Sequence, residues 1–167
     1  MPPVEIRRVS LADLPALVAT LGQVRYFTDR LDRQEAGRGM LLVAFMGGRP
    51  VGDVYLWLEE AEEAEVRRHL PGVPLLGHLE VLPKLQGRGI GTAIMMEAEG
   101  ELRRRGHRLV ALGVDTDNLR AAELYCRLGY IHWGHGLTET TREVDLSDGR
   151  IERLPDKCYV LVKKLTG

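Results

Sequence analysis

The residues best suited to chemistry lie in a glycine-rich turn over residues 86–92. The turn follows the apolar stretch Leu75–Leu82, precedes apolar positions at helical spacing, and carries Gly87, Gly89 and Gly91. The first backbone N–H groups of a helix have no partner within it and lie at its positive end. Because glycine has no side chain, a phosphate can approach those N–H groups closely. The pattern therefore predicts that the chain binds a phosphorylated small molecule.

Two other phosphate-binding loops fit this turn less well. A Walker-type loop ends in Gly-Lys-Ser/Thr, whereas this turn contains Gly89, Ile90 and Gly91. A dinucleotide fingerprint needs a third glycine where the chain has Thr92, and its first glycine directly after the strand. Asp115 does supply an acidic residue at the end of the next apolar stretch, as that fingerprint expects. A nicotinamide-dependent oxidoreductase is therefore disfavoured.

Two motifs of the chain resemble those of a known enzyme family. Gln86-x-x-Gly89-x-Gly91 is similar to the Q/R-x-x-G-x-G/A signature of the GNAT superfamily of acyl-CoA-dependent N-acetyltransferases. Residues 118–130, NLRAAELYCRLGY, are similar to the second motif of that family, N-x-x-A-x-x-x-Y-x-x-x-G-F/Y. The resemblance implies an α/β (α+β) fold in a single domain over residues 1–167. Its central sheet would be mixed, mostly antiparallel and flanked by helices.

The resemblance also implies how the donor, acetyl-CoA, is held. Backbone N–H groups of the turn would bind the pyrophosphate, and the turn consists of Gln86, Gly87, Arg88, Gly89, Gly91 and Thr92 around Ile90. The Arg88 side chain would add a charge-assisted contact. Asn118 would contact coenzyme A or cap its helix, and Arg120 would reach a phosphate or stay solvated. Backbone groups of Leu79 and Val81 would pair with the pantetheine arm and stabilise the developing oxyanion, by ~3 kcal/mol per good donor.

Three side chains are the candidates for proton transfer. By its motif position, Tyr125 would protonate the thiolate of coenzyme A, since a phenol of pKa ~10 suits such a leaving group; its alternative role is packing. The position of the glutamate that serves many relatives as base falls on Leu75. Glu80 and His78 share one face of the predicted strand. They are candidate bases if that face borders the acceptor, and structural residues if it faces the helices.

An acidic segment lies between the predicted hairpin and the strand that enters the turn. Its glutamates are Glu59, Glu60, Glu62, Glu63 and Glu65. Such a cluster would attract a cationic amine. A solvated helix is the favoured interpretation, because Arg67, Arg68 and His69 follow at spacings that pair with the glutamates. No spacing of histidine or cysteine residues indicates a metal site.

Strands and helices alternate along the chain to position these residues. Predicted strands cover residues 4–9, 40–46, 51–58, 75–82, 108–114, 130–134 and 158–164, with a turn at Asp148-Gly149. Predicted helices cover residues 11–21, with Ser10 as N-cap, 25–38, 89–105 and 118–128.

Composition excludes several classes of protein. The 167 residues carry a net charge of −1, which gives no general attraction to nucleic acid or anionic membranes. No apolar run approaches the ~20 residues that span a bilayer, and the first residues lack the apolar core of a secretory signal. Cys126 and Cys158 are too few for a disulfide framework. We therefore expect a cytoplasmic protein with reduced thiols, and a homodimer is one of its expected assemblies.

The predicted activity is transfer of an acetyl group from acetyl-CoA to a primary amine of a small molecule or peptide. Neither cysteine lies in a nucleophile motif, which favours direct attack in a ternary complex over an acyl-enzyme. A non-catalytic acyl-CoA-binding regulatory module is the alternative, because the position of the family glutamate is occupied by Leu75.

Overall fold

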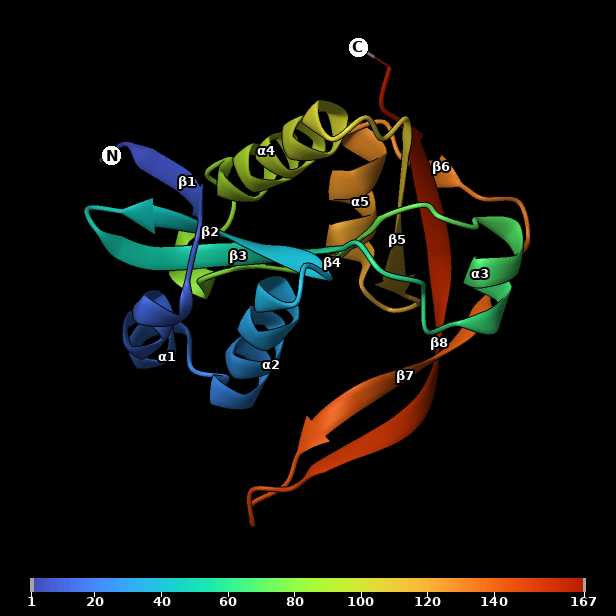
Figure 1. Cartoon of the computed structure of the whole chain (residues 1–167). Coiled ribbons are helices and arrows are strands. Elements are labelled where there is room, and N and C mark those ends of the chain that lie inside the picture. Colours follow the sequence, from blue (N-terminus) through green and yellow to red (C-terminus); the bar gives the residue numbers. More distant parts are fainter. Residues whose placement is uncertain (1, 167) are drawn as a thin grey trace.

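The computed structural model describes residues 2–166, in which one sheet has helices on both faces (Figure 1). The strands are β1 (Val4–Arg8), β2 (Gly39–Met46), β3 (Arg49–Trp57), β4 (Leu75–Val81), β5 (Leu109–Asp115), β6 (Ile131–His132), β7 (Thr138–Asp145) and β8 (Ile151–Lys164). Their order is β1-β2-β3-β4-β5-β8-β6, and β7 pairs with β8. Of these pairs, β4–β5 is parallel and the others are antiparallel. The predicted mixed, mostly antiparallel sheet is confirmed.

The helices are α1 (Leu14–Leu21), α2 (Val24–Glu35), α3 (Ala64–His69), α4 (Ile90–Arg104) and α5 (Leu119–Arg127). Short 3₁₀ turns precede α1 and α4, at Leu11–Asp13 and Pro83–Leu85. Helices α1 and α2 cover one face of the sheet, and α4 and α5 lie on the other (Figure 1). Among the described residues, no helix is both long and apolar enough to cross a bilayer.

The alternation of β2 contributes to two apolar clusters, one on each face of the sheet. Its residues Leu41, Val43 and Phe45 pack with Leu17 of α1 and Phe27 of α2. The residues between them contact the α4 side of the sheet; these are Met40, Leu42 and Ala44. Successive side chains of a strand point to opposite faces, so a strand buried on both faces is apolar throughout. That is why residues 40–46 read as a continuous apolar run.

The sheet opens between β4 and β5. Within residues 2–166, these parallel strands are paired at Leu75↔Ala111 and Leu76↔Leu112 and no further. Beyond that point β4 stays paired with β3, through Asp53↔Glu80 and Gly52↔Val81. The second half of β4 therefore presents a free backbone edge toward β5, next to the glycine-rich turn.

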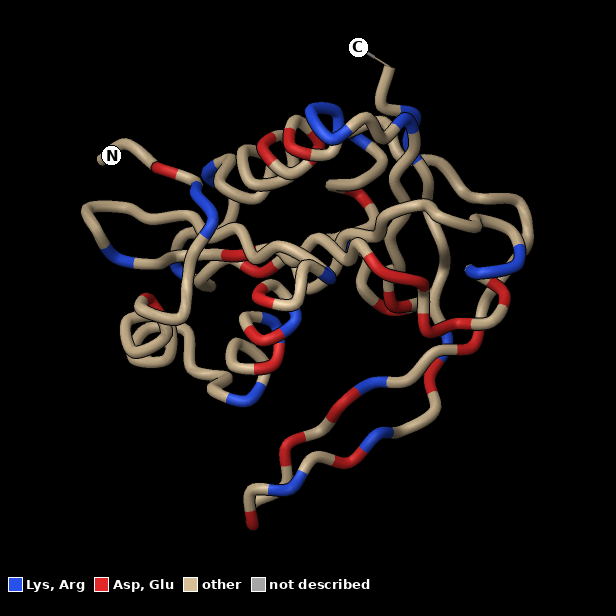
Figure 2. The backbone as a smooth tube through the Cα atoms, in the orientation of Figure 1, with Lys and Arg blue, Asp and Glu red and all other residues tan. Residues whose placement is uncertain are grey.

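A long hairpin of β7 and β8 corrects the predicted extent of the last strands. We predicted the final strand at residues 158–164, whereas β8 begins at Ile151 and pairs with β7 from Asp145↔Ile151 to Thr138↔Cys158. Residues 138–145 read TETTREVD, so they lack the apolar alternation that predicts a half-buried strand. The hairpin projects from the body of the molecule (Figure 1) and carries both acidic and basic residues along its length (Figure 2).

Candidate active site

The glycine-rich turn has the backbone of a helix start. Gly89 is the N-cap residue of α4, with φ 83°, and Gly87 has φ 79°. Both values lie in the left-handed region, which a residue with a side chain adopts at a cost of ~1–2 kcal/mol. The turn therefore favours glycine at Gly87 and Gly89, of which Gly89 is a position of the motif. It leaves the first N–H groups of α4 without partners inside the helix.

A cavity of about 670 Å³ lies against this turn. It is lined by the end of β4, the turn, the start of α4 and one face of α5. The predicted donor-binding residues that line it are Leu79, Val81, Gln86, Gly87, Gly89, Gly91, Thr92 and Asn118. Two of the candidate catalytic residues, Glu80 and Tyr125, line it as well. The fold thus brings the two sequence motifs together around one space.

The arginines that line this cavity differ in part from those that the sequence predicted. Among the described residues, the lining includes Arg120 and Arg127 of α5 but not Arg88 of the turn. Arg120 lies beside the turn, since a Cβ added at Gly87 would be 3.8 Å from its Nη2 atom. Arg127 was missed, although its spacing of seven residues from Arg120 places both on one helical face.

Two polar side chains hold the walls of the cavity in place. The Gln86 side chain donates from Nε2 to the Val81 carbonyl oxygen at 3.1 Å, which ties the turn to the end of β4. Asn118 accepts a hydrogen bond from the backbone N–H of Ala121 at 3.1 Å. It therefore caps α5, which was one of the two roles expected for it.

Tyr125 is a buried wall of the cavity. Its side chain is 8% exposed, and its ring packs edge-on against that of Tyr130, with centroids 5.9 Å apart. Burial raises the pKa of Tyr125 to about 12, because an apolar environment disfavours the charged phenolate. The hydroxyl is therefore a hydrogen-bond donor throughout the neutral pH range.

A polar network surrounds His78 on the α2 side of β4. His78 Nδ1 lies 3.0 Å from Oδ2 of Asp53, a β3 residue that is 1% exposed. The other ring nitrogen, Nε2, lies 2.8 Å from Oε1 of Gln23 and 3.5 Å from Oε1 of Glu80. Tyr26 of α2 stacks on the imidazole, with ring centroids 3.8 Å apart. The ring of His78 therefore packs against α2, as the structural alternative expects, while its Nε2 atom faces Glu80, which lines the cavity. The two alternatives for this face of β4 are thus not exclusive.

The network determines the protonation of His78. Gln23 Nε2 donates to Glu80 Oε2 at 3.1 Å, so its amide oxygen is the atom that faces His78. Both ring nitrogens then face oxygen acceptors, which assigns a hydrogen to each of them. Burial by itself would lower the pKa of His78, but the hydrogen bond and charge of Asp53 outweigh it, so this pKa is raised. The Asp53 pKa is also raised, because burial outweighs the effect of His78.

Two strained residues meet in this network. Gln23 and His78 have φ values of 56° and 59°, and within the described chain no other residues apart from glycines have positive φ. Such a conformation costs ~1–3 kcal/mol and tends to occur at functional sites. The two residues lie far apart in sequence, yet their side chains are hydrogen-bonded to each other.

Three titratable side chains of this network are spaced closely enough to be tested as ligands of a metal ion. Ligand atoms of Asp53, His78 and Glu80 lie within 4.8 Å of one another. A metal ion binds one nitrogen of a histidine, and its ligands converge on one point. Here the two carboxylates face opposite nitrogens of the same ring. We therefore assign the group as a hydrogen-bonded chain and not as a set of metal ligands.

Comparison with known proteins identifies the family. The sequence model of the Acetyltransferase (GNAT) family matches residues 8–130. The chain belongs to this family. An uncharacterised N-acetyltransferase of Methanocaldococcus jannaschii is 35% identical over 108 residues, which cover 63% of this chain and 43% of the relative. The chain spans less than half the length of the curated relatives it matches.

Solved structures of N-acetyltransferases share the fold. The ribosomal-protein-S18-alanine N-acetyltransferase of Escherichia coli superposes with a TM-score of 0.68 at 18% identity, covering 99% of this chain and 96% of that one. The PaiA N-acetyltransferase of Thermoplasma acidophilum, in complex with coenzyme A, has a TM-score of 0.66 at 16% identity, covering 97% and 99%. The predicted GNAT resemblance is confirmed.

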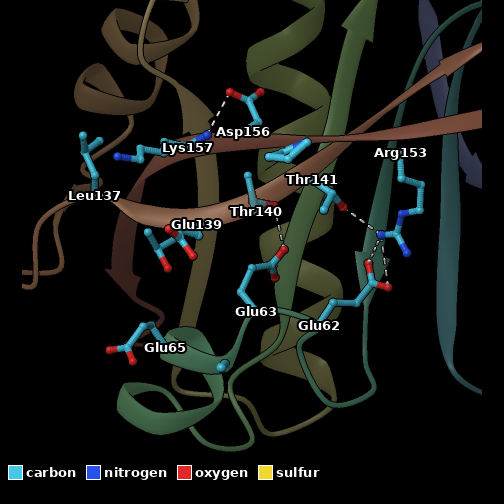
Figure 3. Close-up of a pocket in the computed structure, with 13 residues that line it drawn as sticks. Glu62, Glu63, Glu65, Leu137, Glu139, Thr140, Thr141, Arg153, Asp156 and Lys157 are labelled. Carbon is cyan, nitrogen blue, oxygen red and sulfur yellow. Dashed lines mark hydrogen bonds and ion pairs between the residues drawn. The ribbon is translucent and has the colours of Figure 1, made fainter.

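This GNAT chain has a second, larger groove of about 1080 Å³ between α3 and the β7–β8 hairpin (Figure 3). Its carboxylates outnumber its cations, Arg153 and Lys157; they are those of Glu62, Glu63, Glu65, Glu139 and Asp156. The predicted helical pairing holds for Glu65, which lies 3.3 Å from His69. Glu63 instead accepts a hydrogen bond from Thr140 of β7 at 2.9 Å. The acidic segment thus joins α3 to the hairpin.

Proposed function

We propose that this GNAT protein transfers an acetyl group from acetyl-CoA to a primary amine. The observation that carries the proposal is the 670 Å³ cavity, where the helix start, the free edge of β4 and Tyr125 meet beside Glu80. The complex of PaiA with coenzyme A supports this choice of donor, since that protein shares the fold. The amine itself, a small molecule or a peptide terminus, is a matter for experiment.

The donor's phosphates would bind at the start of α4. The unpartnered N–H groups there and the positive end of the helix dipole favour an anion. Arg120 and Arg127 line the same cavity, and their guanidinium groups can form charge-assisted hydrogen bonds to phosphate oxygens. We therefore assign the cationic contacts to Arg120, for which the sequence already offered a phosphate contact, and to Arg127, in place of Arg88.

The pantetheine arm would lie along the free edge of β4. Its amide groups can pair there with the backbone of Leu79 and Val81, because β5 has already diverged. An N–H group at this edge would also stabilise the oxyanion that develops on the thioester carbonyl, by ~3 kcal/mol for a well-placed donor. Both residues line the cavity.

Tyr125 would assist the departing sulfur by hydrogen bonding. Its pKa is raised to about 12, so complete transfer of its proton to a thiolate of pKa ~8.5 would be uphill by ~5 kcal/mol. A hydrogen bond to a charged acceptor contributes ~1.5–3 kcal/mol without such a transfer. We therefore propose that Tyr125 donates a hydrogen bond to the sulfur and keeps its proton.

The acceptor amine would approach from the α2 side, beside Glu80 and His78. Glu80 attracts the ammonium form. After the ammonium loses one proton to solvent, the nitrogen attacks the carbonyl carbon, and the C–S bond breaks with its electron pair going to sulfur. The nitrogen gives its next proton to Nε2 of neutral His78, which later releases it to solvent. The products are the amide, the thiolate of coenzyme A and protons.

Thiol-release kinetics over a panel of amines test this function. The panel should contain polyamines, aminoglycosides, amino acids and peptide N-termini. Direct transfer predicts initial rates that depend on both substrates and give intersecting double-reciprocal lines, whereas parallel lines would contradict it. If titration calorimetry detects no heat with acetyl-CoA, the proposed donor site is contradicted. Tight binding without turnover of any amine would favour the regulatory alternative. A cytoplasmic location and homodimer formation stay predictions from the sequence.

A further inference from the structure

We propose that Asp53 is a positioning residue that acts through His78. It holds a hydrogen on Nδ1 and so makes Nε2 the nitrogen that receives a proton from the acceptor amine. The inference rests on the proposed acetyl transfer and adds to it a residue in β3 that neither motif contains.

The backbone of β4 turns His78 toward Asp53. In the ladder with β3, Tyr55 opposes Gly77 and Asp53 opposes Glu80. His78 and the residue after it therefore face a single β3 residue, which is the arrangement of a β-bulge. A bulge re-aims a side chain, and here the left-handed φ of 59° at His78 accompanies its 3.0 Å contact with Asp53.

Packing leaves the imidazole little freedom to rotate. Tyr26 stacks on one face with an interplanar angle of 21°, and Phe27 lies edge-on with centroids 6.5 Å apart. Asp53 holds Nδ1 from within the protein, whereas Nε2 faces Gln23 and Glu80. Because Glu80 also lines the donor cavity, Nε2 is the nitrogen on the side of the reaction.

The Gln23 amide shows where an acceptor nitrogen could lie. Its Nε2 atom is 3.1 Å from Glu80 Oε2, while its Oε1 atom is 2.8 Å from His78 Nε2. One small polar group thus contacts both Glu80 and the outer nitrogen of the imidazole. An amine that displaces this amide would meet a carboxylate that attracts its cation and a nitrogen that can take its proton.

The charged groups around His78 define its titration. Asp53 faces it from β3, Glu80 from β4, and Tyr26 and Arg30 from α2. When the imidazolium loses its Nε2 proton, the hydrogen on Nδ1 stays in place because it is hydrogen-bonded to Asp53. The neutral ring then has its lone pair on Nε2 and can act as a base. This neutral form appears as pH rises through the raised pKa of His78.

A second buried carboxylate provides a matched control. Glu99 of α4 is 2% exposed, accepts a hydrogen bond from the Tyr130 hydroxyl at 2.9 Å, and lies 2.7 Å from Lys163 Nζ. Arg103 of α4 also lies 3.7 Å from Glu99, whose polar partners are thus one hydroxyl and two cations. Among the described residues, none of these partners is His78 or lines the donor cavity. Replacing Asp53 or Glu99 by the corresponding amide removes a buried carboxylate in both cases. Of these two residues, only Asp53 faces the imidazole.

The first experiment titrates the imidazole by ¹⁵N NMR, which needs neither substrate nor turnover. The His78 signals are assigned by their loss in His78→Gln. In the unmodified protein we expect the pKa of His78 to lie above its ordinary value and the neutral ring to carry its hydrogen on Nδ1. Asp53→Asn should lower that pKa by about 1–3 and move the hydrogen to Nε2, whereas Glu99→Gln should change neither.

The second experiment measures the pH dependence of turnover with an amine that the panel identifies. Asp53→Asn should reduce kcat ~100-fold or more, leave KM for acetyl-CoA unchanged, and move the rising limb of the profile to lower pH. Replacing a residue with a purely structural role would lower turnover without shifting the rising limb of the pH profile.

An ordinary His78 pKa or an Nε2–H tautomer in the unmodified protein overturns the proposal, even if Asp53→Asn fails to fold. An unmoved limb in a folded Asp53→Asn protein also overturns it. If the NMR results hold but no amine is acetylated, the proposed function fails while the Asp53–His78 pairing stands.

Discussion

The proposed donor side and the proposed acceptor side of the site are built from different parts of the chain. On the proposed donor side most binding groups are backbone atoms, presented by left-handed glycines and by a strand edge that has lost its neighbour, and Arg120 and Arg127 add cationic side chains. On the acceptor side they are side chains, and Asp53, His78 and Gln23 come from three separate segments. Backbone groups need only the correct conformation, whereas a side-chain network needs the correct residue at every position.

This difference has consequences for substitution. At the backbone groups of the donor side a change acts when it adds bulk or charge, since main-chain donors are present in every residue except proline. At the acceptor side a change acts when it removes a specific atom. We therefore expect the two sides to respond to different kinds of mutation, and the following predictions test this in order of decreasing effect.

Adding a charged side chain to the turn should have the largest effect. Gly89→Glu places bulk and negative charge where the pyrophosphate would bind, so acetyl-CoA binding should become undetectable in titration calorimetry. Gly47→Glu is the matched control, because Gly47 also has a left-handed φ, of 59°, and open space around it. Equal loss of binding in both variants would attribute the effect to backbone strain and contradict the anion site.

Removing the imidazole should be next in size. His78→Gln keeps a polar side chain but removes the base, so kcat should fall ~100-fold or more, as expected for general base catalysis. Calorimetric affinity for acetyl-CoA should stay near that of the unmodified protein, because the donor side is intact. A parallel loss of affinity would show that the two sides are not separable.

Removing the phenol should have a smaller effect. Tyr125→Phe deletes a hydrogen bond to a charged sulfur, worth ~1.5–3 kcal/mol, so kcat should fall ~10- to 100-fold with little change in acetyl-CoA affinity. Tyr130→Phe is the control, since the Tyr130 hydroxyl donates its hydrogen bond to Glu99. This variant should have a lower melting temperature but a kcat close to that of the unmodified protein. Unchanged turnover in Tyr125→Phe would remove the proposed role.

The smallest effect should come from the cations at the cavity. Arg120→Gln and Arg127→Gln together should weaken acetyl-CoA binding ~10-fold at low salt and reduce its salt dependence, because they remove charge-assisted contacts. Arg88→Gln should weaken it less, since Arg88 lies outside the lining that the described residues form. If calorimetry instead shows a larger loss of affinity for Arg88→Gln than for the double variant, the phosphate contact belongs to Arg88 of the turn.

The elements with a strong local signal were predicted well. Helix α4 was expected at residues 89–105 and spans Ile90–Arg104, and α5 was expected at 118–128 and spans Leu119–Arg127. Glycine at the start of one helix and after the end of the other marks these bounds. Strand β7 was missed, because Thr138–Asp145 is polar and is held by pairing with β8 instead of by apolar burial.

The candidate site divides in the same way. The turn and the Tyr125 helix were recognisable because their function depends on glycines and a motif that are contiguous in sequence. Glu80 and His78 were proposed from strand alternation. Asp53 was not, although a carboxylate within an apolar strand was a usable signal. Gln23 offered no signal, because its role follows from where the α1–α2 connection meets β4.

The amino-acid sequence by itself determined the left-handed turn, the helix that starts there and the family to which they point, since glycine conformation and helix caps depend on neighbouring residues. The opening between β4 and β5, the arginines that reach the cavity and the Asp53–His78 pair were decided by tertiary structure. Each of these depends on distances between segments that lie far apart along the chain, and such distances exist only when the sheet has formed.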